Sequence, residues 1–148
     1  DMSVVALNLS ESHRTMENIR RSGAFTVSVA DAAHVTEADY FGVVSAKNEP
    51  RKFEKSGLTA VRAETVDAPV ICEFPLCLEC QYLGYEGGEH GIGAIGRVVN
   101  VTADENVMTD GKIDMQKVDA IAYDQYTNGY YRIGERVGEA FRCGLKLK

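Results

Sequence analysis

The chain has 148 residues, of which 45% are hydrophobic and 26% are charged, a composition typical of one folded domain spanning residues 1–148. Sixteen Lys and Arg against 22 Asp and Glu give a net charge of −6, which disfavours nonspecific binding to nucleic acid or to an anionic membrane. Apolar runs stay well short of the roughly 18 residues of a transmembrane helix, and the first residues lack a signal-peptide pattern. We therefore expect a cytoplasmic protein.

The first predicted elements are a strand, a polar turn, a helix and a second strand. Met2 to Leu9 has the composition of a strand, and because it starts with no lead-in, we expect a segment upstream of Asp1. Arg14 to Ser22 is predicted as a helix whose apolar residues share one face and whose end is marked by Gly23. Ala24 to Ala30, rich in β-branched residues, is the next predicted strand.

A second helix is predicted to begin near Thr36. Thr36 with Asp39 three residues later has the pattern of a capping box, and Val35 can pack on Tyr40 as a hydrophobic staple. The helix would then contain the sequence DYFGVVSA.

A third, shorter helix is predicted over Arg51 to Ser56 and ends at Gly57. The segments after it, Leu58 to Glu64 and Val70 to Phe74, are predicted to be extended. A polar turn that contains Pro69 separates these two segments.

The second half of the chain is predicted to be mostly β. Leu76 to Tyr85 and Ile92 to Val101 are the two long strand candidates, joined as a hairpin around Gly87-Gly88. Strands outnumber helices and do not alternate with them, which favours an antiparallel barrel or an α+β arrangement over a doubly wound sheet.

Weaker signals follow the hairpin. Asp110-Gly111 is predicted as a turn, and Asp114 as the N-cap of a helix that continues through Ala122. The segment from Gly129 to Phe141 mixes strand and helix signals, so it receives no assignment.

The stretch between the first strand and the first helix is the most informative one for chemistry. One anion, such as a phosphate, can be bound here by three kinds of donor: the hydroxyls of Ser10, Ser12 and Thr15, the Arg14 guanidinium and the free amides of a helix start. The alternative is ordinary capping by Ser12, with His13 and Arg14 in solvent. The chain has no Walker motif.

The cysteines and histidines do not form a metal-binding pattern. Cys77 and Cys80 have CxxC spacing, but they lie in a predicted strand, where residues three apart point to opposite faces. Cys72 and Cys143 lie elsewhere in the sequence, so we expect reduced, buried thiols rather than a zinc site. Three histidines occupy three separate turn regions: His13, His34 and His90.

Candidates for catalysis and for stacking each have a structural alternative. Asp39 can act as a general base, but its place in a capping box favours a structural role. Tyr130 and Tyr131 can stack on a planar ligand, and packing in the core is the favoured interpretation.

Five segments, in this order, resemble the flavin reductase-like family of FMN-binding split β-barrels, particularly its flavoredoxin-like branch. They are SHRTMENIRRSGAFTVSV, ADYFGVVSAKNEPRKFEKSGLT, VDAPVICEFPLCLEC, IGRVVNVTADE and YYRIGERVGEAF. The resemblance implies a mainly β fold, a six-stranded antiparallel split barrel with peripheral helices, and a homodimer that holds FMN near the subunit interface. Family members also carry an N-terminal strand and a ring-contacting loop, which we expect to be missing before Asp1.

The resemblance also implies a cofactor site. The family's S-R-H-T segment at the FMN phosphate matches Ser12 to Thr15 with its middle two residues exchanged. The segment C-G-x-x-S-G at the flavin matches Phe41 to Ala46, where Phe41 replaces a cysteine and Ala46 a glycine. The implied cofactor-binding residues are Ser10, Ser12, His13, Arg14, Thr15, Phe41, Ser45 and Lys52.

Two functions follow from the resemblance. The first is an FMN-dependent oxidoreductase that takes hydride from NADH or NADPH. The second is a flavoredoxin-like electron-transfer protein with a redox partner protein and little direct activity towards NAD(P)H. Because the flavin itself accepts the hydride, we name no catalytic acid or base and no metal ligand.

Overall fold

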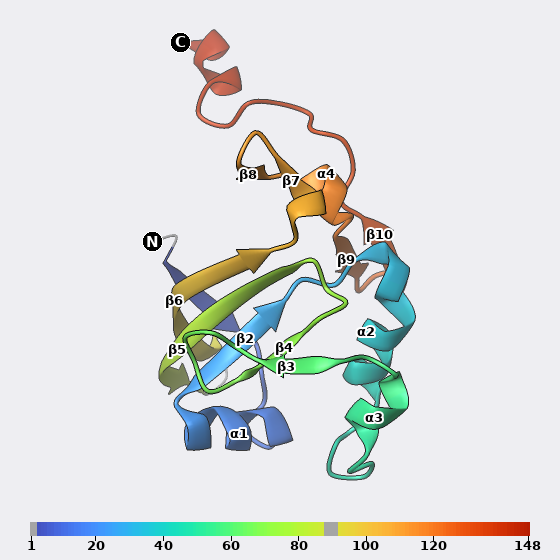
Figure 1. Ribbon diagram of the computed structural model, residues 1–148. Helices are drawn as coiled ribbons and strands as arrows, with labels where there is room; N and C mark the ends of the chain where they lie inside the picture. The colour runs from blue at the N-terminus through green and yellow to red at the C-terminus, as the bar shows by residue number, and fades with distance from the viewer. Residues whose placement is uncertain (1–2, 88–91) are drawn as a thin grey trace.

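The structure is a computed structural model that describes residues 3–87 and 92–148 (Figure 1). Within these residues strands outnumber helices, which confirms the predicted mainly β fold. The α-helices are α1 (Arg14–Ser22), α2 (Val35–Val43), α3 (Lys52–Ser56) and α4 (Met115–Val118). The strands are β1 (Val4–Leu7), β2 (Ala24–Ser28), β3 (Ala60–Arg62), β4 (Pro69–Ile71), β5 (Leu76–Glu86), β6 (Gly93–Ala103), β7 (Met108–Thr109), β8 (Lys112–Ile113), β9 (Ile121–Asp124) and β10 (Gly129–Arg132).

A four-stranded antiparallel sheet in the order β1-β6-β5-β2 forms the centre of the molecule. The pairing of β5 with β6 runs from Leu76 opposite Ala103 to Glu86 opposite Gly93, so the predicted long hairpin is confirmed. Gly88, in its predicted turn, lies outside the described residues. Because this sheet is not closed in the described part of the chain, the six-strand count of a split barrel stays a prediction.

Helix α1 closes one end of the main core. Its buried Met16 and Ile19 pack with Phe25 of β2, Cys80 of β5 and Ala94 of β6. The helix ends where the sequence predicts, at Gly23, which has a φ of +69° and donates its N–H to the Ile19 carbonyl at 2.8 Å. The start of α1 is therefore held at a fixed position beside the sheet.

Glu79 is a buried carboxylate in the middle of β5 and has an exposed fraction of 0%. Its oxygens accept hydrogen bonds from the Thr65 N–H at 2.8 Å, the Thr65 hydroxyl at 2.6 Å and the Glu64 N–H at 3.3 Å, and from the Asn100 amide at 3.1 Å. Burial alone would raise the pKa of Glu79, but these hydrogen bonds together lower it. The carboxylate thereby fastens the loop between β3 and β4 to the central sheet.

Two predicted helix boundaries are wrong. The helical segment begins at Asp31 rather than at Thr36, because the Asp31 carboxylate accepts the His34 N–H at 3.0 Å. The chain then forms a 3-10 helix, Ala32–His34, which continues into α2. Asp114 does cap α4, as predicted. However, α4 ends at Val118, because Asp119 adopts a left-handed conformation with a φ of +51°, and β9 follows at once.

The shorter strands differ from their predicted spans at the ends. Pro69 is the first residue of β4 rather than part of the turn, a position where its missing N–H costs the ladder nothing. The predicted turn at Asp110-Gly111 joins β7 to β8, and both residues have a positive φ.

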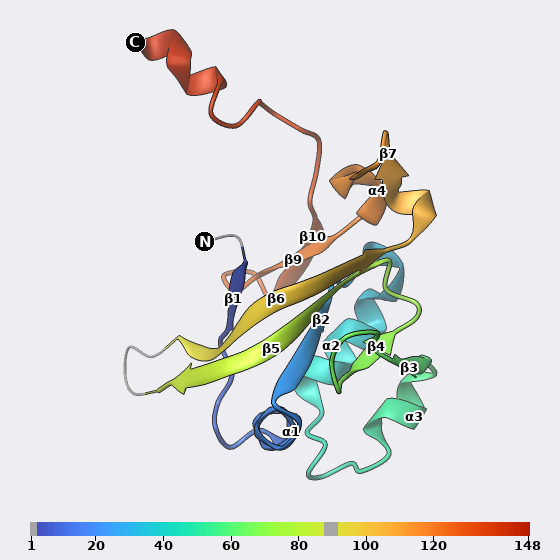
Figure 2. The same cartoon turned by 60° about the vertical axis from the view of Figure 1, so that its left-hand side comes forward.

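The segment that received no assignment, Gly129 to Phe141, forms β10 and the first part of an arm, residues 133–148. The arm leaves the body of the molecule and ends in a 3-10 helix, Cys143–Leu147 (Figures 1 and 2). Tyr130 and Tyr131 of β10 are 40% and 56% exposed, so the expectation that they pack in the core is wrong. They lie on a two-stranded hairpin with β9, where the centre of the Tyr130 ring is 5.4 Å from that of the Tyr123 ring. No helix in residues 3–87 and 92–148 has both the length and the apolar character needed to cross a bilayer.

Candidate functional site

Seven of the eight predicted cofactor-binding residues line one cleft of about 420 Å³. We call it the α1–α2 cleft, because its walls are the start of α1, the end of α2 with the turn after it, and the start of α3. Its lining residues are Ser12, His13, Arg14, Thr15, Phe41, Gly42, Val43, Val44, Ser45, Ala46, Lys47 and Lys52. Two stretches that are distant in the sequence, residues 12–15 and residues 41–52, are thus brought together.

Ser10, the eighth residue, is not among the lining residues but contacts Ser12, which is. Its hydroxyl is 2.9 Å from the Ser12 hydroxyl and also accepts the Ser12 N–H at 3.4 Å. The role of Ser10 that the geometry supports is to hold Ser12 in place.

The start of α1 faces the cleft without a side-chain cap. His13 is the N-cap residue, and its side chain makes no capping hydrogen bond. The alternative that Ser12 caps this helix is therefore wrong. The first-turn amides and the positive end of the helix dipole are directed to the side where Ser12, Arg14 and Thr15 lie, which favours an anionic ligand.

Two cations of the cleft share one carboxylate. Glu17 on α1 accepts from Lys47 at 2.9 Å and from Arg14 at 2.8 Å. The hydrogen bonds from Lys47 and then Arg14 lower the pKa of Glu17. Lys47 could not be predicted from the sequence, because only the turn after α2 brings it opposite α1.

Lys52 is the most firmly positioned cation of the cleft. Its ammonium donates to the Phe41 carbonyl at 2.7 Å and lies 5.4 Å from the centre of the Phe41 ring. Burial lowers the pKa of Lys52. Phe41 in turn stacks on Phe53, with ring centres 6.0 Å apart and an interplanar angle of 19°, so the aromatic wall is also fixed.

The other sequence candidates lie outside this cleft. Asp39 is not part of a capping box: it accepts the Tyr130 hydroxyl at 2.8 Å, a contact that links α2 to β10. Cys77 and Cys80 are buried free thiols in β5, and burial raises the pKa of Cys80 to about 11. His34 faces Asp31 and Phe74, while His90 is among the residues that the structure does not describe. In the described ranges, no group of three or more His, Cys, Asp or Glu side chains is arranged to hold a metal.

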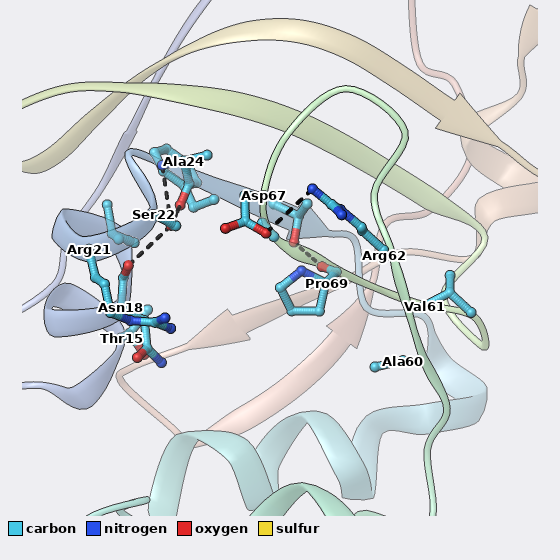
Figure 3. A pocket seen from close by; sticks show the side chains of 14 residues that line it. Thr15, Asn18, Arg21, Ser22, Ala24, Ala60, Val61, Arg62, Asp67 and Pro69 are labelled. Carbon is cyan, nitrogen blue, oxygen red and sulfur yellow. Dashed lines mark hydrogen bonds and ion pairs between the residues drawn. The ribbon is translucent and has the colours of Figure 1, made fainter.

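A larger cavity of about 630 Å³ lies between α1 and the strands β2, β3 and β4 (Figure 3). Thr15 lines both spaces, and it is the only predicted site residue among the lining residues of this cavity. Figure 3 shows Arg21 and Arg62 on opposite sides, with Asp67 paired to Arg62 at 3.9 Å. Because Arg21 and Arg62 do not point to one place, this cavity is less suited to bind an anion than the α1–α2 cleft.

Comparison with known proteins identifies relatives across most of the chain. The family described as "Flavin reductase like domain" matches residues 2–126. A solved structure of flavoredoxin from Desulfovibrio vulgaris (Miyazaki F) matches with a TM-score of 0.87 and 37% identity, over 95% of this chain and 75% of that chain.

Two curated relatives are uncharacterized proteins. One, from Halalkalibacterium halodurans, is 32% identical over 121 residues, which cover 76% of this chain and 57% of the relative. The other, from Aeropyrum pernix, is 30% identical over 90 residues, which cover 60% of this chain and 34% of the relative. The chain thus spans about a third of one curated relative and somewhat more than half of the other.

Proposed function

The chain belongs to the flavin reductase like domain family, and from that premise we propose that it binds FMN in the α1–α2 cleft and serves as an NAD(P)H-dependent flavin oxidoreductase. The observation that carries the proposal is the convergence of Ser12, Arg14, Thr15 and Lys52 on one cleft at a helix start. Hydroxyls, a guanidinium, an ammonium and first-turn amides form a donor set that fits a phosphate dianion.

Each part of the cleft has a distinct task in holding the cofactor. Lys52, fixed by the Phe41 carbonyl, supplies a positioned charge, whereas the more exposed Arg14 can turn towards a phosphate. The Phe41 ring and the backbone of residues 42–46 form the wall that would exclude water. When bound, FMN supplies a centre that accepts hydride, so the chain needs no acid or base of its own for that transfer.

The second candidate function is a flavoredoxin-like electron carrier that exchanges electrons with a protein partner and reacts little with NAD(P)H. It is favoured by the 37% identity to the flavoredoxin of Desulfovibrio vulgaris across 95% of this chain. Both candidates share the FMN site, and for both we propose a homodimer. They differ in whether a pyridine nucleotide reaches the flavin.

Paired substitutions test the cofactor site. Arg14→Ala and Lys52→Ala should each raise the FMN dissociation constant about 10- to 150-fold, the effect of losing one charge-assisted hydrogen bond. The controls lie on the same helices but outside the cleft: Arg20→Ala on α1, whose partner is Glu11, and Lys55→Ala on α3, whose partner is Glu49. Titration of protein fluorescence with FMN gives the constants. If the FMN dissociation constant is unchanged in both Arg14→Ala and Lys52→Ala, the assignment of the FMN site to the α1–α2 cleft is refuted.

An absorbance spectrum separates the two functions. Protein reconstituted with FMN is mixed anaerobically with NADH, then with NADPH, and finally with dithionite. Rapid bleaching of the flavin bands by a pyridine nucleotide supports the oxidoreductase. Bands that persist until dithionite is added support the electron carrier, and a failure to bind FMN at all refutes both.

A further inference from the structure

The arm, residues 133–148, leaves apolar side chains in solvent. It is anchored at its start, where the Ile133 N–H donates to the Ala120 carbonyl at 2.8 Å. Beyond that point Val137, Phe141 and Leu147 are 102%, 98% and 93% exposed, and the arm runs away from the body in both views (Figures 1 and 2). Large apolar side chains gathered on one exposed segment are typical of an interaction surface.

A cavity of about 630 Å³ lies at the base of the arm, and we call it the base pocket. Its apolar lining consists of Ile113, Met115, Ile133 and Val137, contributed by the β7–β8 hairpin, α4 and the first residues of the arm. Ile113, Met115 and Ile133 are 37%, 43% and 47% exposed. The pocket therefore offers apolar surface and has room for an aromatic side chain.

The charges of the arm and of the segment around the base pocket are complementary. Residues 133–148 carry four basic and two acidic side chains, although the whole chain has a net charge of −6. Residues 104–124, which contain the β7–β8 hairpin and α4, carry six acidic and two basic side chains. A cationic arm is attracted to an acidic surface of this kind.

We propose that the arm docks on a second copy of this chain, with Phe141 in the base pocket of the partner. A two-fold arrangement makes the contact reciprocal, because each copy carries both the arm and the pocket. Residues 133–137 line the base pocket of their own chain, and the rest of the arm runs away from the body of the molecule, so its end is placed to enter the base pocket of a second copy. Arg142, Lys146 and Lys148 then face the acidic segment of the partner.

This inference rests on one part of the proposed function, the homodimer, and assigns one surface through which its two copies contact each other. It does not depend on the flavin, because the arm and the base pocket share no residue with the α1–α2 cleft. Measuring FMN binding on the same samples therefore distinguishes the failure of one proposal from the failure of the other.

The first test is the oligomeric state of the full chain by sedimentation. The wild type should be a dimer at micromolar concentration, and Phe141→Ser should raise its dissociation constant at least about tenfold, because two buried rings are lost per dimer. Tyr126→Ser is the matched control, since Tyr126 is an aromatic residue 88% exposed on the β9–β10 turn. A monomeric wild type, or equal constants for Phe141→Ser and the wild type, overturns the proposal.

A second test asks which molecule receives the arm. Cys143 lies two residues beyond Phe141, and Gln116 lines the base pocket. In the full chain with Cys72→Ser, to remove the other exposed thiol, Gln116→Cys should give disulfide-linked dimers on mild oxidation. Covalent dimers on a non-reducing gel support arm exchange, whereas bonds confined to single chains show that the arm folds back on its own pocket and overturn it.

Discussion

Glu79→Gln tests whether one buried carboxylate holds the β3–β4 loop on the central sheet. In the wild type, one carboxylate oxygen accepts from the Thr65 N–H and hydroxyl, and the other accepts from the Glu64 N–H and the Asn100 amide. A glutamine side chain has nearly the same shape, but its NH₂ group must face two of these donors in either orientation. The substitution therefore removes charge and acceptor capacity without creating a cavity.

The expected loss follows from the number of contacts. Hydrogen bonds to a charged group contribute about 1.5–3 kcal/mol each, and leaving buried donors unpaired adds to the loss. With two of the four bonds lost and the rest weakened, we expect Glu79→Gln to lower the free energy of unfolding by about 3–5 kcal/mol. Glu64→Gln, in which an exposed side chain of the same loop is changed, should have an effect of less than about 0.5 kcal/mol.

The pH dependence supplies a second criterion. The folded-state pKa of Glu79 is lowered below its ordinary value of 4.5, so its stabilisation is fully present above that value and is lost as the pH falls through the folded-state pKa. Urea unfolding of the wild type and Glu79→Gln should therefore differ most near neutral pH and converge under acid conditions. If Glu79→Gln is no less stable than Glu64→Gln at pH 7, or if its deficit does not shrink in acid, the reasoning is refuted.

Two further predictions concern the main core. Gly96→Ala should lower the free energy of unfolding by about 1–3 kcal/mol in chemical denaturation, because a Cβ there would collide with the Phe25 ring. Gly84→Ala should be nearly neutral, because no heavy atom lies within 4 Å of a Cβ at that position. Equal losses for the two variants would contradict this packing. Because burial raises the pKa of Cys80 to about 11, its thiol should resist iodoacetamide at pH 8 while the exposed Cys72 reacts. Mass spectrometry of the alkylated peptides measures the two rates. Equal labelling rates in the folded protein would refute the burial of Cys80.

Local sequence signals predicted the elements whose determinants are local. The α1 helix ends at Gly23 and the β7–β8 turn falls at Asp110-Gly111, because in both cases the backbone needs a positive φ that glycine adopts readily. The start of α2 was missed because Asp31 acts across a 3-10 turn, several residues before the capping-box pattern at Thr36. The end of α4 was missed because a non-glycine residue, Asp119, adopts the left-handed conformation there.

The candidate site shows the same division between local and distant information. Residues 12–15 already suggested an anion site from their hydroxyls, their cation and the helix that follows. Phe41, Ser45 and Lys52 could be joined to them only by resemblance, since the tertiary fold brings α2 and α3 to α1. Lys47 and Glu17 had no sequence signal, because an ion pair between a turn and a helix has no fixed spacing along the chain.

The charge of the α1–α2 cleft reconciles an acidic chain with an anionic ligand. The chain carries a net charge of −6, yet Arg14, Lys47 and Lys52 with one carboxylate, Glu17, leave the cleft two positive charges in excess. Because salt screens charges beyond roughly 8–10 Å, a phosphate in the cleft responds to this local excess more than to the distant acidic residues. Glu17 also keeps Arg14 and Lys47 close together before a ligand arrives, which reduces the repulsion between them. The arrangement therefore matches a dianion in charge and leaves the rest of the surface unattractive to polyanions such as nucleic acid.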